Sequence, residues 1–370
     1  MEDMIFVILF LLSFININIK GINSYFDDYM NIENTSAIKG LFVWMIFFRH
    51  FTHYLKYDSK KNKKSILIDF SFKQNIVSLF LFYSGYGIFE SFKKKGNNYI
   101  KTLPIKSLIF LIKTEIILFF FLCNNLLLGI KFNFRDYLQA IIFRRSIGNS
   151  YWFCFTIITI YIYSYFSFFF IKKNNFSILG IILITIICAL HVYFVYNFYH
   201  PKSIISVDTI ICFIFGFYYS FFKTIIEKIV TKNDIIYFGI ISILILKYNR
   251  FNDYVPKNLY YISLTNGIFT IIIILISLKI RLKNEFLLLL NSHSYSIFLL
   301  QRIVMKYIKV KNTFKNNEFI KFFFEFITVI FMAILFDKYS LFIDKLFKTR
   351  NKQTKYQHTL ITNKLIDINK

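Results

Sequence analysis

The chain has 370 residues, of which 56% are hydrophobic and 21% aromatic, and its mean hydropathy is +0.53. A soluble protein of this length keeps a polar shell, whereas apolar runs here recur from end to end. The formal charge of +25 would suit a nucleic-acid binder. The lysines, however, lie between the apolar runs, so we expect no nucleic-acid partner and assign their charge to contacts with lipid headgroups.

Apolar runs long enough to cross a bilayer, about 20 residues each, follow one another along the chain. The first covers residues 4–19, and its acidic start favours a retained helix over a cleaved signal peptide. Ten further spans are predicted at 37–55, 74–92, 105–129, 151–171, 177–197, 204–222, 234–247, 258–279, 285–308 and 319–343. This pattern predicts an all-α polytopic membrane protein, a bundle of about ten core transmembrane helices plus one extra N-terminal helix.

The organisation predicted from these spans has three parts. They are an N-terminal hydrophobic helix and loop (1–33), a transmembrane domain (34–345) and a basic cytoplasmic tail (346–370). The lysine-rich run 93–101 is predicted to be cytoplasmic by the positive-inside rule. We therefore expect a multi-pass protein of a bacterial inner or plasma membrane. The pattern leaves the oligomeric state open.

The segment "IKGLFVWMIFFRHF" carries a lysine and a histidine in an otherwise apolar span. Lys39 and His50 are eleven residues apart, so on a helix they share one face, about 16 Å apart along the axis. One interpretation is that Lys39 snorkels to the interface while His50 ends the helix. The other is that both side chains line a cavity, because ionisable groups inside a membrane span are costly and usually face a cavity or partner.

Three other groups of polar or aromatic residues are candidates for binding or catalysis. Ser84, Gly85 and Tyr86 interrupt an apolar span and predict either close helix packing or a cavity wall. Glu115 lies within a span and predicts either a structural ion pair or a group that orients His50. The four cysteines, which form no CxxC pair, are interpreted as small hydrophobic side chains, so no metal site and no disulfide is expected.

A cluster at the expected outer end of the 151–171 span is the last candidate. Tyr151 and Trp152 begin this span and predict either an aromatic belt at the interface or a stacking surface for a sugar. Arg144 and Arg145 come just before them. They could bind the phosphate of a ligand or lipid headgroups, and the sequence does not decide between the two.

Four segments, taken in order, resemble the motifs of the membrane-bound acyltransferase 3 family. They are "KGLFVWMIFFRHF", "LFYSGYGIFESFKKKGNNYIK", "GNSYWFCFTIITIYIY" and "LLNSHSYSIFLLQRIVMKYI". The resemblance covers about residues 34–345. It departs from the family pattern at Lys39, where arginine is usual, at Asn291, where glycine is common, and at Gln301, where histidine is common.

The resemblance implies an O-acyltransferase of the cell envelope, with acyl-CoA, acetyl-CoA by family habit, as the donor co-substrate and no permanently bound cofactor. The acceptor would be a hydroxyl of a glycan or a lipid-linked saccharide. His50 would act as a general base or as a transient acyl acceptor. The site residues would be His50 and Glu115 for catalysis, Lys39, Ser84, Gly85 and Tyr86 for the donor, and Tyr151, Trp152, Arg144 and Arg145 for the acceptor.

Two other functions remain open at this stage. The chain could be a transporter or flippase for an envelope saccharide, without chemistry, although it shows no internal symmetry and only three prolines. It could also be an assembly component of a polysaccharide system that has lost catalysis. His50 stands at the histidine position of the first family motif, and this favours the enzyme over an assembly component without catalysis.

Overall fold

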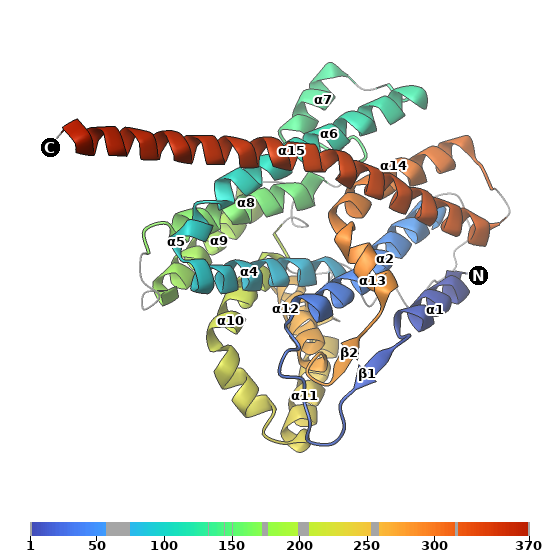
Figure 1. The fold of residues 1–370 in the computed structure, drawn as a ribbon. Helices are drawn as coiled ribbons and strands as arrows, with labels where there is room; N and C mark the ends of the chain where they lie inside the picture. Colours follow the sequence, from blue (N-terminus) through green and yellow to red (C-terminus); the bar gives the residue numbers. More distant parts are fainter. Residues whose placement is uncertain are drawn as a thin grey trace.

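The structure of the protein is a computed structural model, which describes residues 2–56, 75–131, 133–143, 145–149, 151–171, 177–198, 207–252, 259–314 and 317–368. About 82% of the chain is helical. This confirms the predicted all-helical class. Figure 1 shows the helices packed against one another, with the N-terminus and the C-terminus on opposite sides of the bundle.

The helices correspond well to the predicted spans. In chain order they are α1 (Glu2–Ser13), α2 (Ile32–Lys56), α4 (Asn75–Lys95), α5 (Asn97–Ile100), α6 (Leu103–Leu127), α7 (Phe134–Ile141), α8 (Tyr151–Phe168), α9 (Ser177–Phe198), α10 (Ile210–Val230), α11 (Asp234–Asn252), α12 (Leu259–Ile276), α13 (Glu285–Ser292), α14 (Ser294–Lys311) and α15 (Glu318–Ile368). The apolar runs therefore place the helices, and polar or charged residues mark many of their ends.

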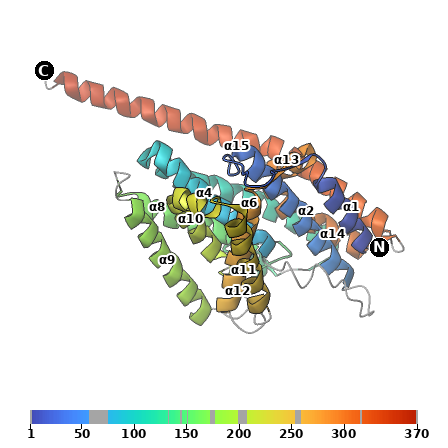
Figure 2. The same ribbon diagram turned by 90° about the horizontal axis from the view of Figure 1, so that it is seen from below.

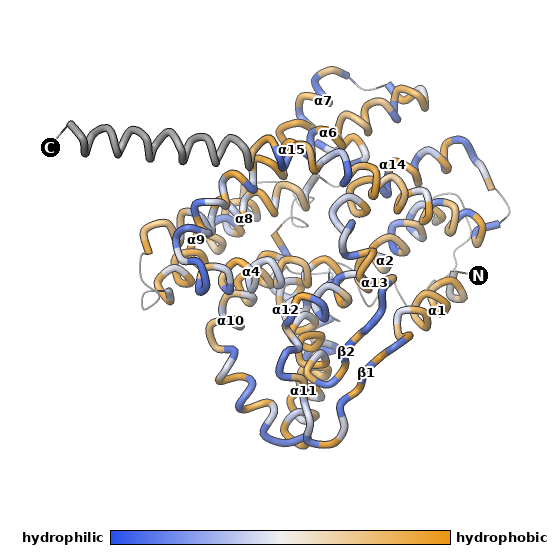
Figure 3. Tube along the Cα trace, viewed as in Figure 1, coloured by the Kyte–Doolittle hydropathy of each residue, from blue (hydrophilic) through white to orange (hydrophobic). Residues whose placement is uncertain are grey.

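Four helices are long and apolar enough to cross a membrane: α9, α10, α12 and the Glu318–Phe347 part of α15. In α9 only 22% of the most apolar window is buried, so most of its apolar side chains face outward. Figure 3 shows hydrophobic residues along most of the helices. An exposed apolar surface of this kind indicates a membrane protein. The predicted count of about ten core transmembrane helices is not confirmed beyond these four.

The N-terminal segment differs from the single span predicted for it. The helix α1 has 12 residues, which is about 18 Å and too short to cross a hydrocarbon layer of about 30 Å. The chain then forms strand β1 (Ile17–Ile19), which pairs antiparallel with β2 (Ile280–Leu282). The strand pair joins the start of the chain to the segment that follows α12. This contact between distant segments has no signal in the local sequence.

The helices α4 and α10 cross closely at two glycines. A Cβ atom added to Gly85 would lie 2.1 Å from the carbonyl oxygen of Phe213, and one added to Gly216 would lie 2.2 Å from that of Phe82. Real Cβ atoms do not approach this closely, so only glycine fits at either position. Small residues at a crossing let two helix backbones approach in this way.

The helices α2 and α14 run side by side in the same direction. An Arg302 nitrogen lies near His50. One turn further along α2 and two turns further along α14, Lys309 donates a hydrogen bond to the carbonyl oxygen of Tyr54. The predicted span 285–308 is in fact broken at His293, where α13 ends and α14 begins. With this break, α13 packs against the Gly40 region of α2 through Leu287, and α14 contacts the His50 region of α2.

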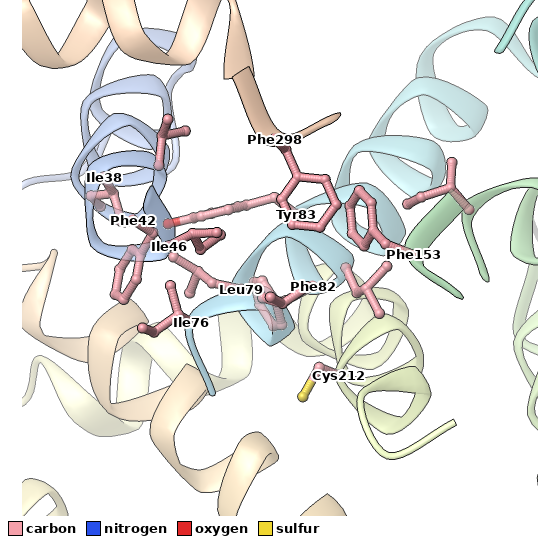
Figure 4. Packing of buried hydrophobic residues seen from close by; sticks show 14 of the residues in the cluster. Ile38, Phe42, Ile46, Ile76, Leu79, Phe82, Tyr83, Phe153, Cys212 and Phe298 are labelled. Atoms are coloured by element: carbon pink, nitrogen blue, oxygen red, sulfur yellow. The ribbon is translucent and has the colours of Figure 1, made fainter. Parts of the chain in front are cut away.

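The core of the bundle is formed by apolar side chains of several helices. Figure 4 shows Ile38, Phe42 and Ile46 of α2 together with side chains of α4 and with Phe298 of α14. Figures 1 and 2 both show α15 running along the bundle and then extending beyond it toward the C-terminus. The predicted boundary between residues 345 and 346 falls within this continuous helix.

Candidate functional site

A cavity of about 290 Å³ lies between α2, α4, α6, α8 and α14. On α2 it is lined by Lys39, Val43 and Ile46. Most of the other lining side chains are apolar, and the polar ones come from α4, α8 and α14. We call this cavity the Lys39 pocket. Its volume is at the lower end of small-molecule sites.

His50 continues the row of α2 residues that line the pocket. Lys39, Val43 and Ile46 are spaced by four and three residues, and His50 follows four residues after Ile46. These intervals keep successive side chains on one helix face. On α14, likewise, Phe298 lines the pocket and Arg302 follows four residues later. His50 and Arg302 therefore lie about one turn beyond the pocket, on the two helices that form its walls.

Lys39 lines the pocket without a hydrogen bond or ion pair to any of the described residues. Its side chain is half-buried. A lysine so enclosed in an apolar span, with no carboxylate beside it, is costly unless a ligand or solvent neutralises it. Of the two sequence interpretations, a cavity-lining cation fits this arrangement better than a lysine that extends to the interface.

His50 is held by Arg302. The Nη2 atom of Arg302 lies 3.4 Å from Nδ1 of His50. A guanidinium can only donate hydrogen bonds, so Nδ1 is the acceptor in this contact. A neutral imidazole then carries its proton on Nε2. The lone pair that a base or an acyl acceptor would use thus faces Arg302 in this state.

The three residues predicted from the second motif lie in different places. Ser84 lines the Lys39 pocket. Gly85 is at the crossing with α10, and the Tyr86 ring lies 6.4 Å from the Tyr219 ring of that helix. The packing interpretation therefore holds for Gly85, and Tyr86 likewise packs beside α10, whereas the cavity-wall interpretation holds for Ser84. Neither Gly85 nor Tyr86 lines the pocket.

Sequence reasoning missed Tyr83, which does line the pocket. It is 9% exposed, and its hydroxyl is buried with no hydrogen-bond partner in the described residues. A signal was present in the sequence. Val77, Phe80 and Ser84 line the pocket at helical intervals, and Tyr83 falls three residues after Phe80 on the same face.

Glu115 is half-buried on α6 and is not among the lining residues of the pocket. Its Oε1 atom is buried and has no hydrogen-bond partner in the described part of the chain. The neighbouring Thr114 bonds to the hydroxyl of Tyr295, which lines the pocket. Lys113 forms an ion pair of 3.0 Å with Asp344 on α15. The structure therefore shows no contact of Glu115 with His50, and its catalytic role stays a prediction.

Of the predicted acceptor residues, Trp152 and Arg145 do not line the Lys39 pocket. Trp152 is half-buried and packs at the edge of the core, with its ring 5.9 Å from that of Phe153. Arg145 is exposed and forms an ion pair with Asp136. Arg144 and the side chain of Tyr151 lie outside the described residues. Acceptor binding by this cluster stays a prediction.

A second feature that sequence reasoning did not assign lies at the start of α14. Asp337 on α15 accepts a hydrogen bond from Ser296, and its other oxygen lies 2.5 Å from Nδ1 of His293. The carboxylate of Asp337 thus contacts a residue at each end of the first turn of α14. Ser294 and Tyr295, which lie between these two residues in the sequence, line the pocket. Asp337 therefore positions the α14 wall of the pocket.

The described residues contain no group of three histidine, cysteine, aspartate or glutamate side chains that could hold a metal ion. In comparisons with known proteins, no family model, no curated protein and no solved structure matches the chain. The function therefore has to be argued from the site itself.

Proposed function

We propose that the protein is an integral-membrane O-acyltransferase, which moves an acyl group, most simply acetyl, from acyl-CoA to a hydroxyl of a cell-envelope glycan or glycolipid. One observation carries the proposal. An apolar pocket lies along the α2 face, with Lys39, unpaired among the described residues, in its wall and His50 about one turn beyond it. A cation, an apolar pocket for an acyl arm and an imidazole are the parts that such a transfer needs.

The two ends of α2 would then face the two compartments. The lysines at the end of α4 are assigned to the cytoplasm, where acyl-CoA is made. Because α4 returns from the outer side, the start of α2, with Lys39, belongs to the cytoplasmic half of the membrane. His50 belongs to the outer half, where a glycan acceptor is assembled. A helix rise of about 1.5 Å per residue separates the two side chains by about 16 Å.

The donor is a large polyanion with its acyl group on a long, flexible arm. Its phosphates cannot enter hydrocarbon without compensation. In the proposal Lys39 attracts the polar part of the donor as a point charge. The thin arm with its thioester occupies the apolar pocket, whose volume of about 290 Å³ matches a slender group better than a nucleotide.

The transfer itself requires one proton acceptor. The hydroxyl oxygen of the acceptor bonds to the carbonyl carbon of the acyl group, and the carbon–sulfur bond breaks. His50 takes the hydroxyl proton, and the leaving thiolate of CoA receives it. If His50 is an acyl relay instead, its nitrogen holds the acyl group between the two steps. Either role uses the Nδ1 lone pair only after the guanidinium of Arg302 has moved away.

The function is tested by the glycans that the cell makes. Mass spectrometry of surface glycans from cells with and without the gene should show one acyl mass that is lost with the gene. Membranes that contain the protein should also consume acetyl-CoA when they are given the unacylated glycan. The proposal would be contradicted if the saccharide is transported at a rate that does not depend on acyl-CoA and the glycan masses are unchanged. That result would favour a transporter or flippase.

Removing the charge of Lys39 should weaken donor binding. Lys39→Met keeps the length and apolar stem of the side chain, so we expect the KM for acyl-CoA to rise by about tenfold, the equivalent of about 1.4 kcal/mol. Lys39→Arg keeps the charge and should retain a KM close to that of the wild type. Steady-state kinetics in membranes measure both. An unchanged KM in Lys39→Met would show that this lysine does not bind the donor.

A further inference from the structure

The hydroxyl of Tyr83 is a buried polar group without a partner among the described residues. The side chain is 9% exposed and lines the Lys39 pocket. Figure 4 shows its ring extending from α4 toward α2, with the oxygen at the α2 end. Buried hydroxyls normally make a hydrogen bond, and an unmet one costs stability. A ligand in the pocket that offers an acceptor oxygen would satisfy it.

Other tyrosines near the pocket differ from Tyr83 in this respect. The hydroxyl of Tyr295 bonds to Thr114 within the pocket wall, and that of Tyr219 bonds to Tyr29. Among the described tyrosines, Tyr83 alone has a fully buried hydroxyl that lacks a partner. A hydroxyl that served packing alone would leave an unmet donor here, which costs stability. The described residues offer it no acceptor, so we take a ligand in the pocket as its partner.

The surroundings limit what that ligand group can be. Val43, Ile46 and Phe298 form the apolar part of the wall around the space that Tyr83 enters, and Lys39, Ser84 and Ser294 line the same pocket. A neutral hydroxyl beside an apolar wall suits a carbonyl oxygen, whereas the charge of Lys39 suits a phosphate. On the proposed donor, the group that must lie deepest in the pocket, toward His50, is the thioester.

We propose that Tyr83 binds the acyl donor directly: its hydroxyl donates a hydrogen bond to the carbonyl oxygen of the thioester. This inference rests on the proposed function and adds a substrate-contacting residue to it. When the acceptor attacks, that oxygen gains negative charge, and a donor already in place stabilises it more strongly than it stabilises the bound thioester. Tyr83 thus contributes to the rate as well as to binding.

The test compares Tyr83→Phe with Tyr193→Phe in membranes, using acetyl-CoA and the glycan acceptor. Tyr83→Phe removes one oxygen atom and should lower kcat about 100-fold. Tyr193→Phe makes the same change on α9, where the side chain is 61% exposed, and should act like the wild type. If wild type and Tyr193→Phe turn over and Tyr83→Phe matches them, the Tyr83 inference is wrong and the proposed function stands. If the wild type does not turn over acetyl-CoA, the proposed function fails, and the inference with it.

An inhibitor pair identifies the bond itself. Acetonyl-CoA keeps the carbonyl group of the donor but cannot transfer it, whereas S-propyl-CoA has a methylene in its place. Tyr83→Phe should weaken inhibition by acetonyl-CoA about tenfold, the value of one hydrogen bond of about 1.4 kcal/mol, and leave inhibition by S-propyl-CoA unchanged. An equal loss for both inhibitors would show that Tyr83 shapes the pocket and does not bind the carbonyl.

Discussion

Replacing His50 by alanine should abolish acyl transfer while the protein still assembles in the membrane. In the proposed reaction His50 is the group that removes the acceptor proton or carries the acyl group. Loss of a general base typically lowers a rate by about 10²–10⁴-fold, and loss of a covalent relay removes the route altogether. The initial rate of acetyl-CoA consumption, normalised to the amount of protein in the membrane, measures the effect.

A second histidine on the same helix provides the matched control. His53 lies three residues after His50 and is exposed, so His53→Ala should keep most of the activity. Acid quenching with labelled acetyl-CoA then separates the two roles of His50. Label that stays on the wild-type protein but not on His50→Ala indicates the relay. Full activity of His50→Ala, at normal protein levels, would remove His50 from the mechanism.

Replacing Gly85 by alanine should disrupt the crossing of α4 and α10. The added Cβ would lie 2.1 Å from the carbonyl oxygen of Phe213, which is backbone and cannot rotate away. The helices must separate, and overpacking of this kind costs about 1–3 kcal/mol or more. We expect a lower unfolding temperature in detergent and less protein in the membrane. Because α4 also carries Tyr83 and Ser84, activity should fall as well.

Gly87 provides the control on the same helix. A Cβ added there would meet nothing within 4 Å. Alanine is also the better helix former, by about 1 kcal/mol. Gly87→Ala should therefore be as stable as the wild type or slightly more stable. If Gly85→Ala and Gly87→Ala unfold at the same temperature, the close crossing of α4 and α10 is not present in the folded protein.

The positions of the helices could be predicted well because long apolar runs leave few alternatives. The predicted span 177–197 corresponds to α9 (Ser177–Phe198), and 74–92 corresponds to α4 (Asn75–Lys95). The lysines at the end of α4 mark its boundary in the sequence. Composition cannot show how many helices cross the bilayer, since an apolar helix can pack inside the protein or face lipid.

Features that depend on distant contacts could not be predicted from the sequence. The β1–β2 pair joins residues about 260 positions apart, as in the pairing of Ile17 with Leu282. The break between α13 and α14 occurs at His293 without a proline or glycine. Asp337, from α15, holds the first turn after that break. Contacts of this kind between distant residues can be identified only from the packed arrangement of the helices.

The candidate site was predicted in part. Lys39 and Ser84, which the sequence singled out separately, line the same pocket. Helical spacing could have identified Tyr83, but the motif drew attention to Tyr86 instead. The contact of His50 with Arg302 joins two helices about 250 residues apart. No pattern within either helix indicates that contact.

A sidedness experiment tests the central claim most directly. Wild-type protein would be reconstituted in sealed vesicles with isotope-labelled acetyl-CoA on the side that Lys39 faces and the glycan on the other. We predict that label appears on the glycan, that no label crosses as free acetyl-CoA, and that His50→Ala vesicles transfer none. Label that reaches the glycan only when donor and glycan share one compartment, or at the same rate with His50→Ala, would contradict transfer along the α2 face.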